Sequence, residues 1–401
     1  MRIAMISEHA SPLAALGGVD AGGQNTHVAE LAGALAAAGH EVRVYTRRDS
    51  PDLPTVMPMA ERIDVVHVPA GPAQVLGKDE LLPFMGAFAE WLAESWRTEW
   101  RPDVAHAHFW MSGLAAVTAG RRCDVPVVQT FHALGSVKRR HQGSADTSPP
   151  RRIAYERELG RAVDRVIVQC QDEVHELLRL GVPRSQMALV PSGVNVERFC
   201  PDGPAVTREP RRTRILTVAR LVERKGIGDL VRALPAVPGA ELVVVGGPAD
   251  GEVAAGLRRI AAQCGVAGRV VLAGPVPSHE MPQWYRSADM LAATPWYEPF
   301  GLTVLEAMAC GVPVVASSVG GLADTVVDGV TGDLVPPRDP HRLGLALRRL
   351  ASDEVRRLSY AAAAVDRALH IYAWPRIADR LARVYAGVAG VATEPTREAV
   401  A

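Results

Sequence analysis

The sequence predicts an α/β protein built from two doubly wound parallel sheets. Short β-rich runs alternate with longer runs rich in Ala, Leu and Arg along almost the whole chain. The alternation pauses once, in a proline-containing stretch at residues 191–212, and then starts again. Two such arrays indicate two Rossmann-like domains. The length of 401 residues agrees with this, because a domain typically has about 100–200 residues.

Six runs in the N-terminal half have the length and apolar character of strands, and several are apolar on both faces, as in sheets covered by helices on two sides. The expected strands are residues 2–7, 41–46, 63–69, 104–108, 125–130 and 165–170. The expected helices are residues 23–38, 79–97, 112–120, 153–162 and 172–180. Gly39 and Gly181 stand where two of these helices should end.

The same pattern continues in the C-terminal half. The expected strands are residues 215–219, 241–246, 270–274, 290–293 and 312–317. The expected helices are residues 227–233, 252–264, 279–287, 302–309 and 340–351, followed by a later helix near 377–386.

These elements predict five segments: an N-terminal domain at 1–195, a linker at 196–212, a C-terminal domain at 213–375, a helix at 376–390 that packs back on the N-terminal domain, and a tail at 391–401. Open parallel sheets bind ligands at the carboxyl ends of their strands. We therefore expect the ligand site in a cleft between the two domains, formed by loops that follow strands.

Charge and composition exclude several classes of protein. The 44 Lys and Arg residues balance the 44 Asp and Glu residues, so no net charge attracts nucleic acid or an anionic membrane. No stretch of about 18 uncharged apolar residues predicts membrane insertion, and the first residues resemble a strand rather than a signal peptide. The five cysteines are odd in number and widely spaced, unlike a disulfide framework. We expect a cytoplasmic protein.

The first chemical motif is the glycine-rich loop after the first expected strand, GGVDAGG at residues 17–23. Paired glycines such as Gly22 and Gly23 let the backbone approach a ligand closely, and the helix start that follows attracts anions. The motif is neither a Walker loop nor a dinucleotide fingerprint. A flexible surface loop is the alternative.

The second motif is a pair of cations after a strand of the C-terminal half. Arg220 ends that strand, and Lys225 follows five residues later, before the next helix. An Arg fork and a Lys point charge at a strand's carboxyl end can hold a diphosphate. The alternative is a solvated basic turn.

The third motif, EPFGLTVLE, is the most specific. Glu298 lies in a loop before a helix and Glu306 lies inside that helix, so both carboxylates can accept hydrogen bonds from sugar hydroxyls. The amides of Phe300, Gly301 and Leu302 stand at the helix start and can face further ligand oxygens. An ion-paired helix start is the alternative.

Three histidines, His106, His108 and His132, also lie at expected strand ends and favour a place in the cleft. We predict no bound metal, because the sequence has no HExxH, no His/Cys cluster at ligand spacing and no D-x-D. An aromatic stripe at near-helical spacing indicates core or a subunit contact, which leaves a homodimer open. The stripe is Phe84, Phe88, Trp91, Leu92, Trp96 and Trp100.

Together these motifs resemble the retaining glycosyltransferases of the two-Rossmann GT-B type, in the family that includes sucrose-phosphate synthases. The resemblance covers essentially the whole chain and is nearest to the actinobacterial D-inositol-3-phosphate N-acetylglucosaminyltransferases of mycothiol synthesis. Besides the glycine loop, the cation pair and EPFGLTVLE, it rests on HAHFWMSG at 106–113, TFHALGSVK at 130–138 and SGV at 192–194.

The resemblance implies a UDP-sugar as co-substrate and no metal or other cofactor. Arg220 and Lys225 would neutralise the diphosphate, Glu306 would hold the ribose, and Glu298 with the amides of Phe300, Gly301 and Leu302 would bind the sugar. His132 would lie near the transferred sugar, and Gly22 and Gly23 would approach the distal phosphate. The residues implied in catalysis are Arg220, Lys225, His132 and Glu298.

The acceptor residues depart from the family's pattern. Asn25, Lys78 and an arginine at Arg151 or Arg152 match acceptor-binding positions of the inositol-phosphate enzymes. Phe109 and Ala133 stand where those enzymes have Tyr and Thr, so two hydroxyls that bind the acceptor phosphate are missing. Each such hydrogen bond contributes about 1.5–3 kcal/mol. An unphosphorylated acceptor is therefore favoured.

We predict transfer of a hexose or N-acetylhexosamine, with retention, to a hydroxyl of a small polyol or aminocyclitol, as in aminoglycoside antibiotic pathways. The alternative is the inositol-3-phosphate reaction of mycothiol synthesis. Two further classes remain open: a UDP-sugar epimerase, which needs no acceptor, and a non-catalytic binder of nucleotide-sugars.

Overall fold

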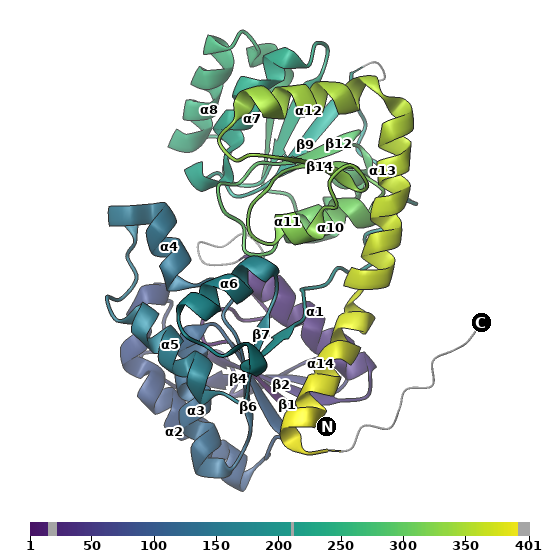
Figure 1. Ribbon diagram of the computed structural model, residues 1–401. Helices are drawn as coiled ribbons and strands as arrows, with labels where there is room; N and C mark the ends of the chain where they lie inside the picture. Colours follow the sequence, from purple (N-terminus) through teal and green to yellow (C-terminus); the bar gives the residue numbers. More distant parts are fainter. Residues whose placement is uncertain (15–21, 210–211, 392–401) are drawn as a thin grey trace, which may run out of the picture. The chain divides into compact units, whose positions relative to one another are not determined.

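The computed structural model describes residues 1–14, 22–209 and 212–391 (Figure 1). The chain divides into two compact units. The first comprises Met1–Val168, Val174–Val190 and the chain from Pro375, and the second comprises Gln169–Glu173 and Pro191–Trp374. Each unit has its own mostly or wholly parallel sheet, so the predicted fold class, two Rossmann-like α/β domains, is confirmed.

The sheet of the first unit has the strand order β3-β4-β2-β1-β5-β6-β7-β8. All neighbouring strands are parallel except β3 and β4, which pair antiparallel at one edge. The strands are β1 (Arg2–Ile6), β2 (Glu41–Arg47), β3 (Val56–Ala60), β4 (Ile63–Val68), β5 (Val104–His108), β6 (Val127–Thr130), β7 (Arg165–Val168) and β8 (Met187–Leu189).

Helices cover this sheet, and α3 packs against both α2 and α5 (Figure 1). The helices are α1 (Gly23–Ala37), α2 (Met85–Thr98), α3 (Trp110–Cys123), α4 (Gly135–Gln142), α5 (Arg152–Ala162), α6 (Gln171–Arg179) and α14 (Trp374–Ala389). The central strands β1 and β5 are almost wholly buried, as strands covered on both faces must be. The aromatic stripe belongs to the core, because Phe88, Trp96 and Trp100 on and just after α2 are buried.

The sheet of the second unit is wholly parallel, with the order β11-β10-β9-β12-β13-β14. Its strands are β9 (Arg214–Val218), β10 (Glu241–Val245), β11 (Val270–Gly274), β12 (Met290–Ala293), β13 (Val314–Ser317) and β14 (Gly332–Val335). Its helices are α7 (Ile227–Ala233), α8 (Glu252–Gln263), α9 (Met281–Arg286), α10 (Leu302–Ala309), α11 (Leu322–Thr325), α12 (Pro340–Ser352) and α13 (Glu354–Arg367). The order reverses between β9 and β12, the switch point where such sheets bind ligands.

The described part of the stretch predicted as a linker, residues 196–209 and 212, instead belongs to the second unit, whose longer segment starts at Pro191. Phe199 is buried in that unit's core, the Arg198 guanidinium donates to Ser278, and the Val206 amide donates to the Gln283 carbonyl. Prolines and a lack of apolar periodicity are typical of a linker, but they also occur in an irregular segment that packs on a domain. The contacts of Arg198, Phe199 and Val206 show that this segment is of the second kind.

Several elements escaped the sequence pattern. Strand β3 is an exposed edge strand with a central Pro58, and β8 and β14 are only three and four residues long, so none shows apolar alternation. Helices α4 and α13 were also missed, although Asp353 caps α13 by accepting from the Arg356 amide. The helix expected at 79–97 starts only at Met85, after two short turns around Pro83.

Helix α14 belongs to the first unit from Pro375 onwards. The buried Tyr385 hydroxyl lies 2.6 Å from Nδ1 of His106 on β5, and the Arg380 guanidinium donates to the Leu189 carbonyl of β8. The last helix is thereby bonded to strands that lie far away in the sequence. Among the residues described, no helix has the length and apolar character needed to cross a bilayer.

Replacing Tyr385 with Phe should lower the stability of the first unit by about 1–3 kcal/mol, because Nδ1 of the buried His106 then loses its partner. The measurement is urea unfolding of the full chain. Arg383→Ala, which removes an exposed ion pair on the same helix, is the control and should change stability by less than about 1 kcal/mol. An unchanged midpoint for Tyr385→Phe would contradict this role of the hydroxyl.

Candidate active site

In the second unit, the segment after β9 carries the predicted cation pair. Arg220 is exposed, and Lys225 ends a short turn at Glu223–Lys225. Gly226 follows with φ +66°, and a Cβ there would lie only 1.9 Å from the Thr294 carbonyl oxygen. Only glycine permits both the conformation and the close approach. Gly226 thus holds the turn of Lys225 against the end of β12.

The structure brings Lys225 together with Glu298. Lys225 Nζ lies 2.5 Å from Glu298 Oε2, and both side chains are about four-fifths buried. The guanidinium of Arg224 is affected by the same charges. Burial lowers its pKa, the Glu298 carboxylate raises it, and the Arg220 guanidinium lowers it. Three positive charges, those of Arg220, Arg224 and Lys225, therefore follow one another in the segment after β9, an arrangement that favours an anionic ligand.

The loop of Glu298 is held by a second glycine turn. The Gly321 amide donates to the Glu298 carbonyl over 3.0 Å, and Gly320 has φ +48° with no room for a Cβ against that same carbonyl. Helix α10 begins immediately after, at Leu302, and Phe300 is buried beneath it. The first amides of a helix lack intrahelical partners, so this fixed start can donate hydrogen bonds to an oxygen-rich ligand.

Glu306 lies on α10 and is oriented by a tyrosine that the sequence analysis did not single out. The hydroxyl of the buried Tyr285 donates to Glu306 Oε2 over 2.6 Å. Burial raises the pKa of Tyr285, and the Glu306 carboxylate raises it further. The phenol therefore stays protonated and keeps donating, which fixes the position of one oxygen of the Glu306 carboxylate.

In the first unit, residues 17–21 of the predicted glycine loop lie outside the described part of the chain, while Gly22 and Gly23 lie within it. Asn25 anchors the start of α1: its Oδ1 accepts from the Gly22 amide and its Nδ2 donates to the Ser11 carbonyl. The side chain is buried and bonded inside the protein. The structure thus gives Asn25 a positioning role, and its predicted contact with an acceptor stays a prediction.

Two residues with strained backbones stand after neighbouring strands. Phe109 follows β5 with φ +82°, and His132 follows β6 with φ +60°. Non-glycine residues in this region cost of order 1–3 kcal/mol and gather at functional sites. His132 Nε2 lies 2.9 Å from Nδ1 of His108, the last residue of β5. Two of the three predicted strand-end histidines are therefore in direct contact.

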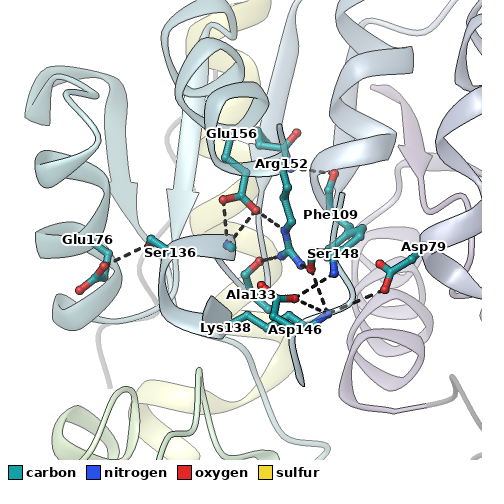
Figure 2. Close-up of polar contacts among 12 residues, drawn as sticks. Asp79, Phe109, Ala133, Ser136, Lys138, Asp146, Ser148, Arg152, Glu156 and Glu176 are labelled. Atoms are coloured by element: carbon teal, nitrogen blue, oxygen red, sulfur yellow. Dashed lines mark hydrogen bonds and ion pairs between the residues drawn. The ribbon is translucent and has the colours of Figure 1, made fainter. Parts of the chain in front are cut away.

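Arg152, a predicted acceptor residue, is almost fully buried, and several of its guanidinium hydrogens are used within the protein (Figure 2). Its Nε donates to Glu156 over 2.7 Å, and its Nη atoms donate to Ser148 and to the Ala133 carbonyl. Glu156 also accepts from the Gly135 amide. Burial raises the pKa of Glu156, while Arg152 and that amide lower it.

A second ion pair lies beside the first. Lys138 Nζ is 3.1 Å from Asp146 and 3.9 Å from Asp79, and it donates to Ser148 (Figure 2). Burial raises the pKa of Asp146, but the two hydrogen bonds from Ser148 and the charge of Lys138 prevail and lower it to about 2. Asp146 is thus ionised at neutral pH and balances Lys138.

The other predicted acceptor residues lie near these pairs. Lys78 Nζ is 5.8 Å from the centre of the Phe109 ring, and the Arg152 guanidinium lies 5.0 Å from the same ring. Phe109 and Ala133 are therefore brought together with Lys78 and Arg152. Arg151 is exposed and stacks on Tyr155, 5.1 Å from its ring centre.

The fold also assembles a cluster that linear spacing did not reveal. His27 on α1, His108 and His132 each present a ring nitrogen within 4.8 Å of the others. The three residues lie far apart in the sequence and come from separate elements, so linear spacing gives no sign of the cluster, and the expectation that the protein binds no metal stays a prediction. Burial lowers the pKa of His27 to about 3 and those of His108 and His132 well below the usual value.

Comparison with known proteins identifies the family of this chain. Residues 21–198 match the family described as Glycosyltransferase Family 4, and residues 204–367 match Glycosyl transferases group 1. A D-inositol 3-phosphate glycosyltransferase of Xylanimonas cellulosilytica is 39% identical over 402 residues, with 96% of each chain covered. The chain belongs to glycosyltransferase family 4.

Solved structures agree with this family of glycosyltransferases. The sucrose-phosphate synthase of Thermosynechococcus elongatus has a TM-score of 0.86 at 31% identity, covering 96% of this chain and 98% of that one. HepE of Anabaena, in its complex with UDP and glucose, has a TM-score of 0.73 at 19% identity, covering 96% and 100%. The fold of this glycosyltransferase is therefore GT-B, as predicted.

Five residues of this glycosyltransferase join the candidate site without having been predicted: His27, Lys138, Glu156, Arg224 and Tyr285. Glu156 had a signal, since it follows Arg152 by four residues and such pairs meet on a helix. Arg224 lies between the two predicted cations. The other three come from separate elements, and no local pattern indicates their partners.

Replacing Glu156 with Ala should destabilise the glycosyltransferase by about 3–5 kcal/mol, since it leaves the buried Arg152 charge unpaired. Thermal and urea unfolding would measure the change. Glu158→Ala, at an exposed position of the same helix, is the matched control and should unfold like the unmodified chain. Equal stability of the two variants would contradict the importance of the ion pair.

Proposed function

We propose that this glycosyltransferase moves a hexose or N-acetylhexosamine from a UDP-sugar to a hydroxyl of a small unphosphorylated polyol or aminocyclitol, with retention at the anomeric carbon. An aminocyclitol acceptor would suit a role in antibiotic biosynthesis. The second unit binds the donor and the first unit binds the acceptor. The observation that carries the choice of acceptor is the engagement of Arg152 with Glu156, Ser148 and Ala133.

The donor side of the proposal rests on the residues around α10. Arg220, Arg224 and Lys225 bring positive charge to the end of β9, where a diphosphate would need it. Glu298 and Glu306 supply acceptors for hydroxyls of the sugar and the ribose, and the start of α10 supplies amides. UDP as the nucleotide follows from the family resemblance.

The acceptor side rests on charge balance. Arg152 is paired with Glu156, and Lys138 is paired with Asp146, so neither cation is uncompensated. A phosphate would have to compete with these buried partners, and Phe109 and Ala133 offer it no hydroxyl. A neutral or cationic polyol avoids this cost. The nearby Asp79 carboxylate and Phe109 ring are compatible with an amino group.

The proposed mechanism places charge where the reaction creates it. Cleavage of the bond between the anomeric carbon and the phosphate oxygen leaves that electron pair on UDP. Arg220, Lys225 and the α10 amides stabilise the resulting negative charge. The acceptor hydroxyl attacks the same face of the sugar, and its proton passes to the departing phosphate. The cations supply the charge that a metal would otherwise supply, so we expect activity to survive treatment with a chelator.

The inositol-3-phosphate reaction is the second candidate. Lys78 stays close to Phe109, Arg151 is exposed, and the curated relatives that share 37–39% of residues are named D-inositol 3-phosphate glycosyltransferases. These two cations could bind a phosphate without disturbing Arg152. The two candidates differ only in the acceptor.

The test is a screen of UDP-sugars against free inositol, inositol phosphate and aminocyclitols, with UDP release and product mass as readouts. Product with an unphosphorylated acceptor and the α-anomeric configuration supports the proposal. Product with inositol phosphate alone selects the second candidate. Interconversion of the donor without any acceptor would identify an epimerase, and UDP binding without turnover would identify a binding protein.

Lys225→Ala should lower kcat by about 10²–10³-fold, since it removes one preorganised charge from the leaving diphosphate. Steady-state UDP release measures the change. Arg348→Ala, an exposed position of α12, is the control and should leave kcat unchanged. If Lys225→Ala and Glu306→Ala both turned over at the normal rate, the assignment of the donor site would be wrong.

Tyr285→Phe should raise KM for the UDP-sugar by roughly tenfold and change kcat less. The variant loses the hydrogen bond that positions Glu306, and the weaker contact of Glu306 with the ribose should reduce the binding free energy by about 1.5 kcal/mol. Tyr360→Phe is a matched control, since its buried hydroxyl also donates to a carboxylate, that of Asp333. Both variants should lose stability, but only Tyr285→Phe should change KM. An unaltered KM would show that Tyr285 acts on stability alone.

A further inference from the structure

The histidine cluster of the first unit, formed by His27, His108 and His132, has the composition of a metal site. One nitrogen from each ring lies within 4.8 Å of the other two, and no other group of three such ligands occurs among the described residues. The three rings come from α1, the end of β5 and the second residue after β6. They are therefore carried on or next to regular elements and do not depend on a long loop.

The three rings are shielded from bulk water. His27 and His108 are 5% and 0% exposed, and His132 is half-buried. A neutral imidazole offers a lone pair, and three of them form the donor set typical of open Zn²⁺ sites. Nitrogen donors of this kind also bind Co²⁺, Ni²⁺ and Cu²⁺.

Hydrogen bonding within the cluster is incomplete. His108 Nδ1 is shared with His132, but the buried Nε2 of His108 has no hydrogen-bond partner. Whichever of its nitrogens carries the hydrogen, one polar atom of His108 is unsatisfied, which costs about 1–3 kcal/mol. His132 is in addition held at φ +60°. A purely structural network would be expected to satisfy its buried members.

We propose that His27, His108 and His132 bind one divalent transition-metal ion of the Zn²⁺ type, with a fourth position open to water or another oxygen ligand. His106 is excluded as a ligand, although its ring lies 4.1 Å from that of His108, because Tyr385 and Thr130 occupy both of its nitrogens. Tetrahedral bonds of about 2.0–2.1 Å separate ligand nitrogens by roughly 3.4 Å. One nitrogen of each of the three rings lies within 4.8 Å of the other two, so small side-chain rotations can bring the ligand atoms to this separation.

The consequence for catalysis rests on the proposed function. His132 is the residue expected beside the transferred sugar. A bound ion would coordinate the His132 ring nitrogen and fill the space next to it, so the sugar could no longer contact this side chain. The ion would then inhibit transfer, and a chelator would restore it. Metal binding itself is independent of that role and can be measured with no substrate present.

The experiment uses the full chain without an affinity tag, treated with chelator and then titrated with Co²⁺. The expected result is the visible absorption of tetrahedral Co²⁺, saturating at one ion per chain and displaced by Zn²⁺. His27→Gln and His108→Gln should each weaken binding at least about tenfold. His106→Gln, within the same group of rings, and His279→Gln, on the surface, should keep it.

Thermal unfolding would reveal a variant that fails to fold. In that case the Co²⁺ titration of the unmodified chain still tests whether the site exists. Absence of a saturable Co²⁺ spectrum, or its survival in both His27→Gln and His108→Gln, would overturn the proposal. A metal that binds one to one in a protein without transferase activity would uphold this site and count against the proposed function. Zn²⁺ bound with transfer unchanged would refute only the inhibition.

Discussion

The candidate donor site is built around the ion pair of Lys225 and Glu298, which an anionic ligand would have to separate in order to bind Lys225. Lys225 and Glu298 are in contact and largely buried, so each compensates the charge of the other while no anion is bound. In the proposed donor complex the diphosphate becomes the partner of Lys225. Glu298 is then released to accept hydrogen bonds from sugar hydroxyls. The pair thereby couples binding of the phosphate to binding of the sugar.

This exchange is feasible because the backbone around the pair is fixed. Gly226 packs against the Thr294 carbonyl, and the Thr294 hydroxyl donates to the Gly226 carbonyl in return. The Trp296 amide donates to the Arg224 carbonyl. Only side chains have to move when an anion enters, so the cost of reorganisation stays small, as efficient electrostatic stabilisation requires.

The sequence was sufficient for the order of most elements. Apolar runs of strand length and helical runs between them predict both sheets, because burial on two faces leaves a strong pattern. Edge strands such as β3 and short strands such as β8 show little of this apolar pattern. Strand-end motifs predicted Lys225, Glu298 and Glu306. Their pairings, Lys225 with Glu298 and Tyr285 with Glu306, depend on how separate strands and helices pack.

The first unit illustrates why a residue type does not settle its role. Arg152 is one of the two arginines that the family resemblance implies as acceptor-binding residues, yet its guanidinium donates to the Ala133 carbonyl and lies over the Phe109 ring. Phe109 and the neighbour of Ala133, His132, are the two strained residues of this region. Backbone strain persists only where the surroundings over-determine it. Arg152, held in turn by Glu156, contacts the residues that follow both β5 and β6 from one buried point. A ligand that drew its charge away would therefore break contacts at two strand ends.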